Sequence, residues 1–217
     1  MSRTRTILQW VLIIGVIAVL GYFGYSFLFG SATPATSSGL PNNGGFFQVP
    51  VASPLVYSKE APPWKFTLTA NNAYTLAGRV VGRHEYPATL PDGIIPLDLA
   101  VANGDLLANN NLQYFQFTMG DHTLQYTYDV PTYTGLTEEY IDEHISNSHL
   151  VFLDPALESQ VKAVREGDCL IIKGKLVDIN GISPQKGYIM KTSTVRNDEY
   201  PAGCEIILVE SFEKRTC

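Results

Sequence analysis

The chain is poor in charge and in cysteine. Charged residues make up 17% of its 217 residues, against about 25% in an average globular protein. Its three cysteines cannot form the framework of a disulfide-stapled miniprotein, and no pair has the C-x-x-C spacing of zinc and redox sites. The apolar content of 45% and aromatic content of 11% exclude a disordered chain. At about 100–200 residues per domain, the length fits one folded domain with an appendage.

Residues 7–29 form an apolar run without a charge. As a helix rising about 1.5 Å per residue, this run spans the roughly 30 Å hydrocarbon layer of a bilayer, so we predict a transmembrane helix. Arg3 and Arg5 precede it and the next basic residue is Lys59, which places residues 1–6 in the cytoplasm. A cleaved signal peptide is the alternative, although its apolar region is usually only about 7–15 residues long.

This topology fixes the expected location. The lipid bilayer is the partner of the transmembrane helix, and the chain is a single-pass protein of the cytoplasmic membrane. The rest of the chain is periplasmic or extracellular.

Residues 30–63 are rich in serine, glycine, asparagine and proline, which predicts a flexible tether. Phe46, Phe47 and Val49 interrupt this composition with apolar side chains. They form either an extended arm that packs on the folded domain or a docking segment for a partner. The folded domain is then expected to cover residues 64–217.

The folded part has the alternating pattern of β-strands and one amphipathic helical pattern. Asp154 and Pro155 have the side chains of a helix N-cap and first helical position. We expect a helix over 156–165 and strands over 65–69, 74–81 (joined by a turn at Asn71-Asn72), 113–118 and 123–128 (a hairpin), 169–179 and 204–212.

This order of elements predicts a mainly β domain with one helix. The fold class is a small barrel of the oligonucleotide/oligosaccharide-binding (OB) type, with a β-sandwich as the alternative, plus the N-terminal transmembrane helix. Gly78 and Gly174 stand inside strands, where glycine commonly marks a barrel bend. Residues 88–112 are not expected in a minimal barrel.

The sequence has few signs of catalysis. It lacks the Gly-x-Ser-x-Gly, Walker and His-Glu-x-x-His motifs. The weak candidates are His149, Asp154 and Asp98, since histidine and carboxylate side chains serve as general acids and bases. A structural role is the more common one for such a histidine, and His149 would then hydrogen-bond backbone groups near the start of the helix expected over 156–165. No cofactor is expected and no metal site, because His144 and His149 stand five residues apart and do not share a helical face.

Binding residues are suggested by charge and by aromatic content. The chain carries a formal net charge of −6 and lacks a basic cluster, which argues against nucleic acid as a partner. Tyr114, Tyr126 and Tyr128 suit protein or glycan contacts, or are ordinary strand residues. Arg196 and Asp198 form either a structural ion pair or a polar part of a binding surface.

An oxidising compartment permits a disulfide. The expected bond joins Cys204 with Cys169 or with Cys217. The remaining possibility is that Cys204 is a buried free thiol.

The chain contains several short motifs: Ile95-Pro-Leu-Asp-Leu-Ala100 with Gly104-Asp105, Asn147-Ser-His-Leu150, Gly167-Asp168 with Gly174-Lys-Leu-Val177, and Arg196-Asn-Asp198 with Gly203-Cys-Glu205. These motifs resemble those of a group of bacterial single-pass membrane-anchored proteins to which no activity is assigned. The resemblance covers residues 64–212 and implies a bacterial envelope protein. Where that group has a tryptophan before the glycine of its first motif, this chain has Asn103.

The expected function is that of a membrane-tethered extracytoplasmic binding or assembly module without enzymatic activity. Its partners would be other envelope or membrane proteins, in a larger membrane complex. The alternative is an envelope hydrolase that uses His149 with Asp154 or with a pair of aspartates.

Overall fold

The computed structural model describes residues 40, 44–89, 91–195 and 204–217. The expected transmembrane helix and cytoplasmic N-terminus lie outside these residues, as do Arg196 and Asp198. In the described part, no helix combines the length and the hydropathy needed to cross a membrane.

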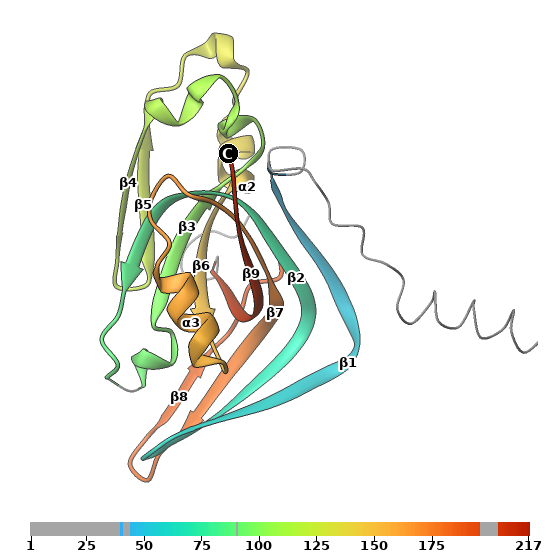
Figure 1. The fold of residues 1–217 in the computed structure, drawn as a ribbon, viewed down its shortest axis with the longest axis vertical. Helices are drawn as coiled ribbons and strands as arrows, with labels where there is room; N and C mark the ends of the chain where they lie inside the picture. The colour runs from blue at the N-terminus through green and yellow to red at the C-terminus, as the bar shows by residue number, and fades with distance from the viewer. Residues whose placement is uncertain (1–39, 41–43, 90, 196–203) are drawn as a thin grey trace, which may run out of the picture. The chain divides into compact units, whose positions relative to one another are not determined.

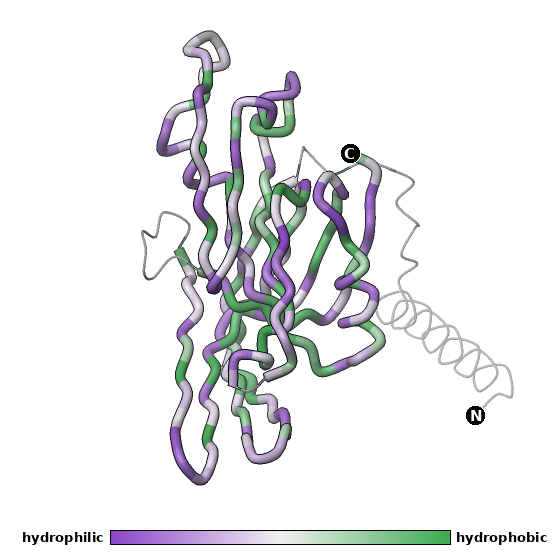
Figure 2. Tube along the Cα trace, turned by 90° about the vertical axis from the view of Figure 1, so that its left-hand side faces the viewer, coloured by the Kyte–Doolittle hydropathy of each residue, from purple (hydrophilic) through white to green (hydrophobic). Residues whose placement is uncertain are grey.

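The described chain is mainly β, with short helices between the strands (Figure 1). Apolar and polar segments alternate along the strands (Figure 2), as expected where one face of a strand is buried. The strands are β1 (Gly45–Ala61), β2 (Trp64–Glu85), β3 (Leu97–Ala102), β4 (Phe115–Gly120), β5 (Thr123–Tyr128), β6 (Ile145–Val151), β7 (Cys169–Ile182), β8 (Gly187–Met190) and β9 (Glu205–Arg215). The helices are α2 (Glu138–His144) and α3 (Pro155–Lys162), with 3-10 turns at η2 (Asp92–Ile94), η3 (Gly104–Leu106), η4 (Ala108–Tyr114) and η5 (Thr132–Thr134).

Five strands pair with one another in a closed ring. The seven-stranded sheet has the order β1-β2-β3-β6-β9-β7-β8, and β2 also pairs with β7, which closes β2-β3-β6-β9-β7 on itself. The β6–β9 pair is parallel and the other pairs of the ring are antiparallel. A core of buried aliphatic side chains from these strands includes Leu76, Leu99 and Ile172.

The expected turn at Asn71-Asn72 is wrong, because β2 continues through it as one long strand. The register with β7 shifts between Ala70 and Asn72, and the register with β3 shifts between Val80 and Gly82. Such β-bulges add twist and bend to a strand without ending it. They suit a strand that pairs with β1 and β3 along one edge and with β7 along the other.

Part of the predicted tether is folded. Residues 45–61 form β1, which pairs with β2, so the expected tether limit at residue 63 is wrong. Phe46 packs on the core, as expected of a packing arm, whereas Phe47 and Val49 are exposed. Proline in this segment did not prevent a strand, because proline is tolerated at sheet edges.

The segment expected outside a minimal barrel contains one strand of the closed ring. β3 lies in the ring and is buried along its whole length. One of its faces looks into the core, and the turn of the β4–β5 hairpin lies over the other, where His122 contacts Asp98. The alternating pattern used to predict strands is absent where both faces are buried.

The predicted helix and hairpin are confirmed. The Asp154 side chain accepts a hydrogen bond from Ala156 N at 2.8 Å and caps α3. β4 and β5 pair in register as a hairpin. The helix α2 was not expected. Its N-cap is Thr137, whose side chain accepts a hydrogen bond from Tyr140 N.

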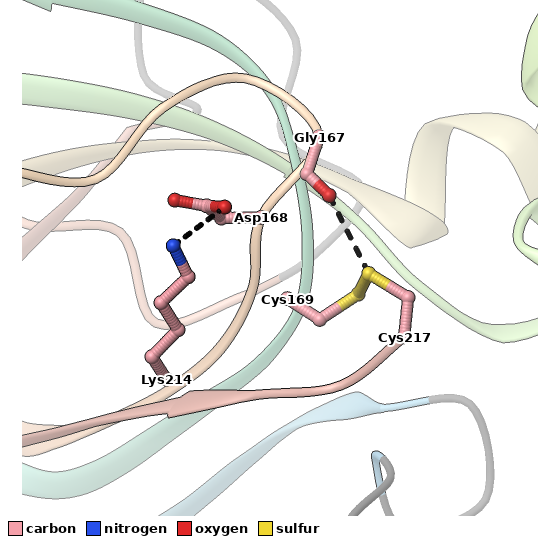
Figure 3. The surroundings of a disulfide bond; sticks show 5 residues. All are labelled: Gly167, Asp168, Cys169, Lys214 and Cys217. Atoms are coloured by element: carbon pink, nitrogen blue, oxygen red, sulfur yellow. Dashed lines mark hydrogen bonds and ion pairs between the residues drawn. A yellow bond between two sulfur atoms is a disulfide. The ribbon is translucent and has the colours of Figure 1, made fainter.

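The disulfide differs from both expected pairings. Cys169 is bonded to Cys217 (Figure 3), with their Cα atoms 5.2 Å apart. Cys204 is free. The pairing of β7 with β9 brings Cys169 opposite Arg215, two residues before Cys217. Asp168 and Lys214 add an ion pair of 2.8 Å beside the bond. The sequence could not show this, because the register of β7 against β9 selects the partner.

Candidate functional site

The candidate site is centred on Asp98 and His149, which stand opposite each other in the β3–β6 pairing. Their neighbours Leu97 and Leu99 belong to the core, so successive side chains of β3 alternate and Asp98 lies on the outer face of the ring. Asp98 is nonetheless fully buried and His149 is 1% exposed. The turn of the β4–β5 hairpin covers them.

The hairpin turn owes its shape to Asp121 and His122. Both have positive φ, 49° and 57°, as a two-residue type I′ turn requires. The His122 N–H donates to the Tyr86 hydroxyl at 2.7 Å, and the two rings stack with centroids 3.9 Å apart. This anchoring holds the His122 ring over the outer face of β3.

Asp98 accepts hydrogen bonds at both carboxylate oxygens. Its Oδ1 lies 2.7 Å from Nδ1 of His149. Its Oδ2 lies 3.0 Å from Nδ1 of His122 and accepts from the Tyr86 hydroxyl at 2.9 Å. Side chains from three separate segments therefore meet at the one buried carboxylate of β3.

The pKa values follow from this network. Burial alone would raise the pKa of Asp98, but hydrogen bonds from His122 and His149 outweigh burial and hold it below its ordinary value. Burial alone would lower the pKa of His149, but its hydrogen bonds with Asp98 and Cys204 raise the pKa to about 9. For Tyr86, burial and the neighbouring Asp98 raise the pKa. At neutral pH the centre is therefore an ionised carboxylate beside a protonated imidazole.

Cys204 lies on the other side of His149, at the entry to β9. The hydrogen bond between the two side chains contributes to the raised pKa of His149. Asn147 donates from Nδ2 to the Cys204 sulfur at 3.7 Å and to the His122 carbonyl at 3.1 Å. Because β6 and β9 run parallel, with Ser148 opposite Glu205, residue 204 comes beside Asn147 and His149.

One carboxylate and two imidazoles also make a donor set suited to a metal ion. The ligand atoms of Asp98, His122 and His149 lie within 4.8 Å of one another. Both Nδ1 atoms, however, already lie at hydrogen-bond distance from the carboxylate. We therefore describe the cluster as a hydrogen-bond network.

The expected catalytic pair of His149 and Asp154 does not form. Asp154 is engaged as the N-cap of α3, and the partner of His149 is Asp98. Asp98 in turn bonds histidines and a tyrosine, and Asp168 is paired with Lys214. An aspartate pair is not part of this centre.

The three candidate binding tyrosines lie near the β4–β5 hairpin. Tyr114 and Tyr126 pack on the small core beneath it, and the Tyr126 hydroxyl bonds Asp142 of α2. Tyr128 is 38% exposed and stacks near Tyr126. Tyr114 and Tyr126 thus have the packing of ordinary structural tyrosines.

A separate cavity of about 550 Å³ opens at the start of β1. Phe46, Phe47, Asn103 and Tyr140 are among the residues that line it. Asn103 is 2% exposed, and its Nδ2 has no hydrogen-bond partner among the described residues. The adjoining Gly104 has a φ of +62°, and a Cβ there would meet the Tyr140 hydroxyl at 2.5 Å, so this wall of the cavity requires glycine.

Sequence reasoning found Asp98 and His149 as separate candidates and missed the rest of the cluster. A hairpin turn containing His122 was visible in the sequence, but its contact with β3 depends on the covering of the barrel. Tyr86 stands in an irregular segment without a pattern. Comparison of the chain with protein-family models, curated proteins and solved structures gave no match.

Proposed function

We propose that this chain is a membrane-tethered extracytoplasmic module, part of a larger envelope complex, that binds another envelope protein along the edge of β1. The tether and its membrane helix are inferred from the sequence of residues 7–44. The observation that carries the docking proposal is the long apolar edge of β1.

We assign the barrel to the OB type. The ring order β2-β3-β6-β9-β7, the single parallel pair and the position of α3 between β6 and β7 support this assignment. OB barrels bind their ligands mainly on the face of the second and third strands. In this chain those strands are β3 and β6.

That usual ligand face is covered by the chain itself. The hairpin β4–β5 is inserted between β3 and β6 in sequence, and its turn packs on their outer face through His122. Together with the acidic net charge, this covering argues against an oligonucleotide ligand. A partner has to approach another part of the surface.

The edge strand β1 offers such a surface. It pairs with β2 and stands last in the sheet order, so its second edge has no strand beside it in the described chain. Phe47, Val49 and Val56 are 59%, 64% and 64% exposed. A long edge with exposed apolar side chains attracts another strand, and proteins usually cover or charge such edges.

The chemistry of β1 indicates the kind of partner. Main-chain N–H and C=O groups of an edge bind an extended segment by strand addition, and the apolar side chains select a segment that is itself apolar. The cavity lined by Phe46 and Phe47 adjoins the start of this edge and provides room for an anchoring side chain. The occupant we propose is an extended apolar segment of a second envelope protein.

Photocrosslinking in intact membranes tests this proposal. A photoreactive residue at Val49 or Val56 should give one discrete adduct with a second protein, while the same residue at exposed Lys173 on β7 should not. A photoreactive residue at Phe47 should give the same adduct. Combining it with the paired substitutions Val49→Lys and Val56→Lys should abolish this adduct without lowering the thermal unfolding midpoint of the protein. Equal adduct patterns from Val49 and Lys173, or none from either, would contradict docking along β1.

A further inference from the structure

We propose that Cys204 is a nucleophilic thiol for acyl transfer, with His149 exchanging its proton and Asp98 orienting His149. The site would react with a carboxylic ester or amide and form a thioester with the acyl group. This proposal is independent of docking along β1.

The three groups lie in line on three neighbouring strands. Asp98 on β3 holds Nδ1 of His149 on β6 at 2.7 Å, and His149 is in turn hydrogen-bonded to Cys204 at the entry to β9. A nucleophile, a base within hydrogen-bond reach and a third group that orients the base are the parts that nucleophilic catalysis requires. Because Nδ1 is held by Asp98, the second ring nitrogen is the one left for the hydrogen bond with Cys204.

The exposure of the three residues suits nucleophilic catalysis, because the nucleophile is the most exposed of them. Asp98 and His149 are buried, whereas Cys204 is partly exposed and free. Burial shields the orienting hydrogen bond from water, and the partial exposure of the residue Cys204 suits a group that a substrate has to reach.

Asn147 supplies a donor beside the thiol. Its Nδ2 lies 3.7 Å from the Cys204 sulfur, and a second bond to the His122 carbonyl holds the amide in place. When sulfur attacks a carbonyl carbon, negative charge develops on the carbonyl oxygen next to it. A preorganised amide N–H at that position stabilises this charge.

The other cysteines argue against disulfide exchange at this site. Cys169 and Cys217 are bonded to each other, so the chain has no second free thiol to resolve a mixed disulfide with Cys204. Acyl transfer needs one thiol only.

The reaction balances with water as co-reactant. In the reactive pair the thiol proton already lies on His149, in keeping with its protonated imidazole. The sulfur then forms a bond to the carbonyl carbon as the carbonyl electron pair moves to oxygen. On collapse, the C–O or C–N bond breaks, and the leaving group takes the proton from His149. Water then adds to the thioester and gives up a proton to His149, which keeps this proton as the C–S bond breaks. The acid is released, and the starting pair of sulfur and protonated His149 is restored.

The test uses the full chain in detergent with p-nitrophenyl acetate as the acyl probe. Mass spectrometry of peptides should locate one acetyl group on Cys204, and none at that position in Cys204→Ser. His149→Gln should slow acetylation at least tenfold, whereas His144→Gln, a histidine outside the cluster, should leave the rate unchanged. Asp98→Asn should change the pH profile of acetylation as well as its rate.

Folding is checked in each variant by its thermal unfolding midpoint. Asn147→Ala should slow acetylation about tenfold or more and serves as the second variant if His149→Gln does not fold. Absence of acetyl-Cys204 in the wild type overturns the proposal. So does an unchanged rate in folded His149→Gln or, where that variant does not fold, in Asn147→Ala.

Discussion

Nδ1 of His149 lies 2.7 Å from Oδ1 of Asp98, although 51 positions separate the two residues in the sequence. The β3–β6 register places them opposite each other, and the hairpin turn at His122 closes over them. A buried carboxylate with three hydrogen-bond donors makes this contact a strong determinant of stability.

Removal of the carboxylate should be costly. Asp98→Ala leaves a protonated imidazole and other donors buried without an acceptor, so we expect a loss of about 3–5 kcal/mol in the free energy of unfolding. Urea denaturation of the full chain measures the loss. Asp105→Ala, at an exposed aspartate of η3, is the matched control and should stay within about 0.5 kcal/mol of wild type. Equal effects of the two substitutions would show that the network does not stabilise the fold.

His149 should make stability depend on alkaline pH. Its pKa rises from 6.5 to about 9 on folding, through its contacts with Asp98 and Cys204. A raised pKa contributes stability that is fully present below pH 6.5 and is lost as pH rises through 9, by at most about 3 kcal/mol. The free energy of unfolding should therefore fall between these pH values. The fall should be much smaller in His149→Gln, and parallel curves for the two proteins would contradict the assignment.

The glycine in the middle of β7 should resist substitution. A Cβ at Gly174 would lie 2.1 Å from the Leu208 carbonyl oxygen, where β7 meets β9 at a register shift. Gly174→Ala forces these strands apart and should cost about 1–3 kcal/mol or more. Gly120→Ala, with open space around its Cβ position, is the control. Similar unfolding midpoints for both variants would be incompatible with the close contact of β7 and β9.

The Cys169–Cys217 bond should stabilise the sheet at the end of β9. It joins positions 48 apart, and removing such a bond costs about 2–4 kcal/mol. Cys217→Ser should lower the unfolding midpoint and make it insensitive to reductant, whereas Cys204→Ser should keep the reductant-dependent shift of wild type. Loss of this shift in Cys204→Ser would indicate a different pairing.

The regular parts of the fold could be predicted from the sequence. The hairpin at β4–β5, the Asp154 cap of α3 and the long strand with Gly174 have local signals, and all three are present in the structure. The strand β3 was missed because both its faces are buried and its pattern does not alternate. β1 was missed because its proline and polar residues are not typical of a strand. It forms a strand through its pairing with β2.

The site was predictable only in fragments. Asp98 and His149 were recognised as side chains capable of acid–base chemistry, but which carboxylate meets which histidine depends on strand register. His122 and Cys204 join them through the hairpin turn and the parallel β6–β9 pair. Neither relation has a local signature. The same reason explains why Cys169 was matched with the wrong cysteine.

The extracytoplasmic location is the claim on which the proposed function depends. The redox state of the three cysteines in living cells tests it most directly, because disulfides persist outside the cytoplasm and thiols stay reduced within it. Cells are quenched with acid, free thiols are alkylated, and the mass of the intact chain is measured by mass spectrometry. The account predicts one alkylated cysteine, Cys204, with Cys169 and Cys217 bonded to each other. Alkylation of all three cysteines would contradict an extracytoplasmic domain.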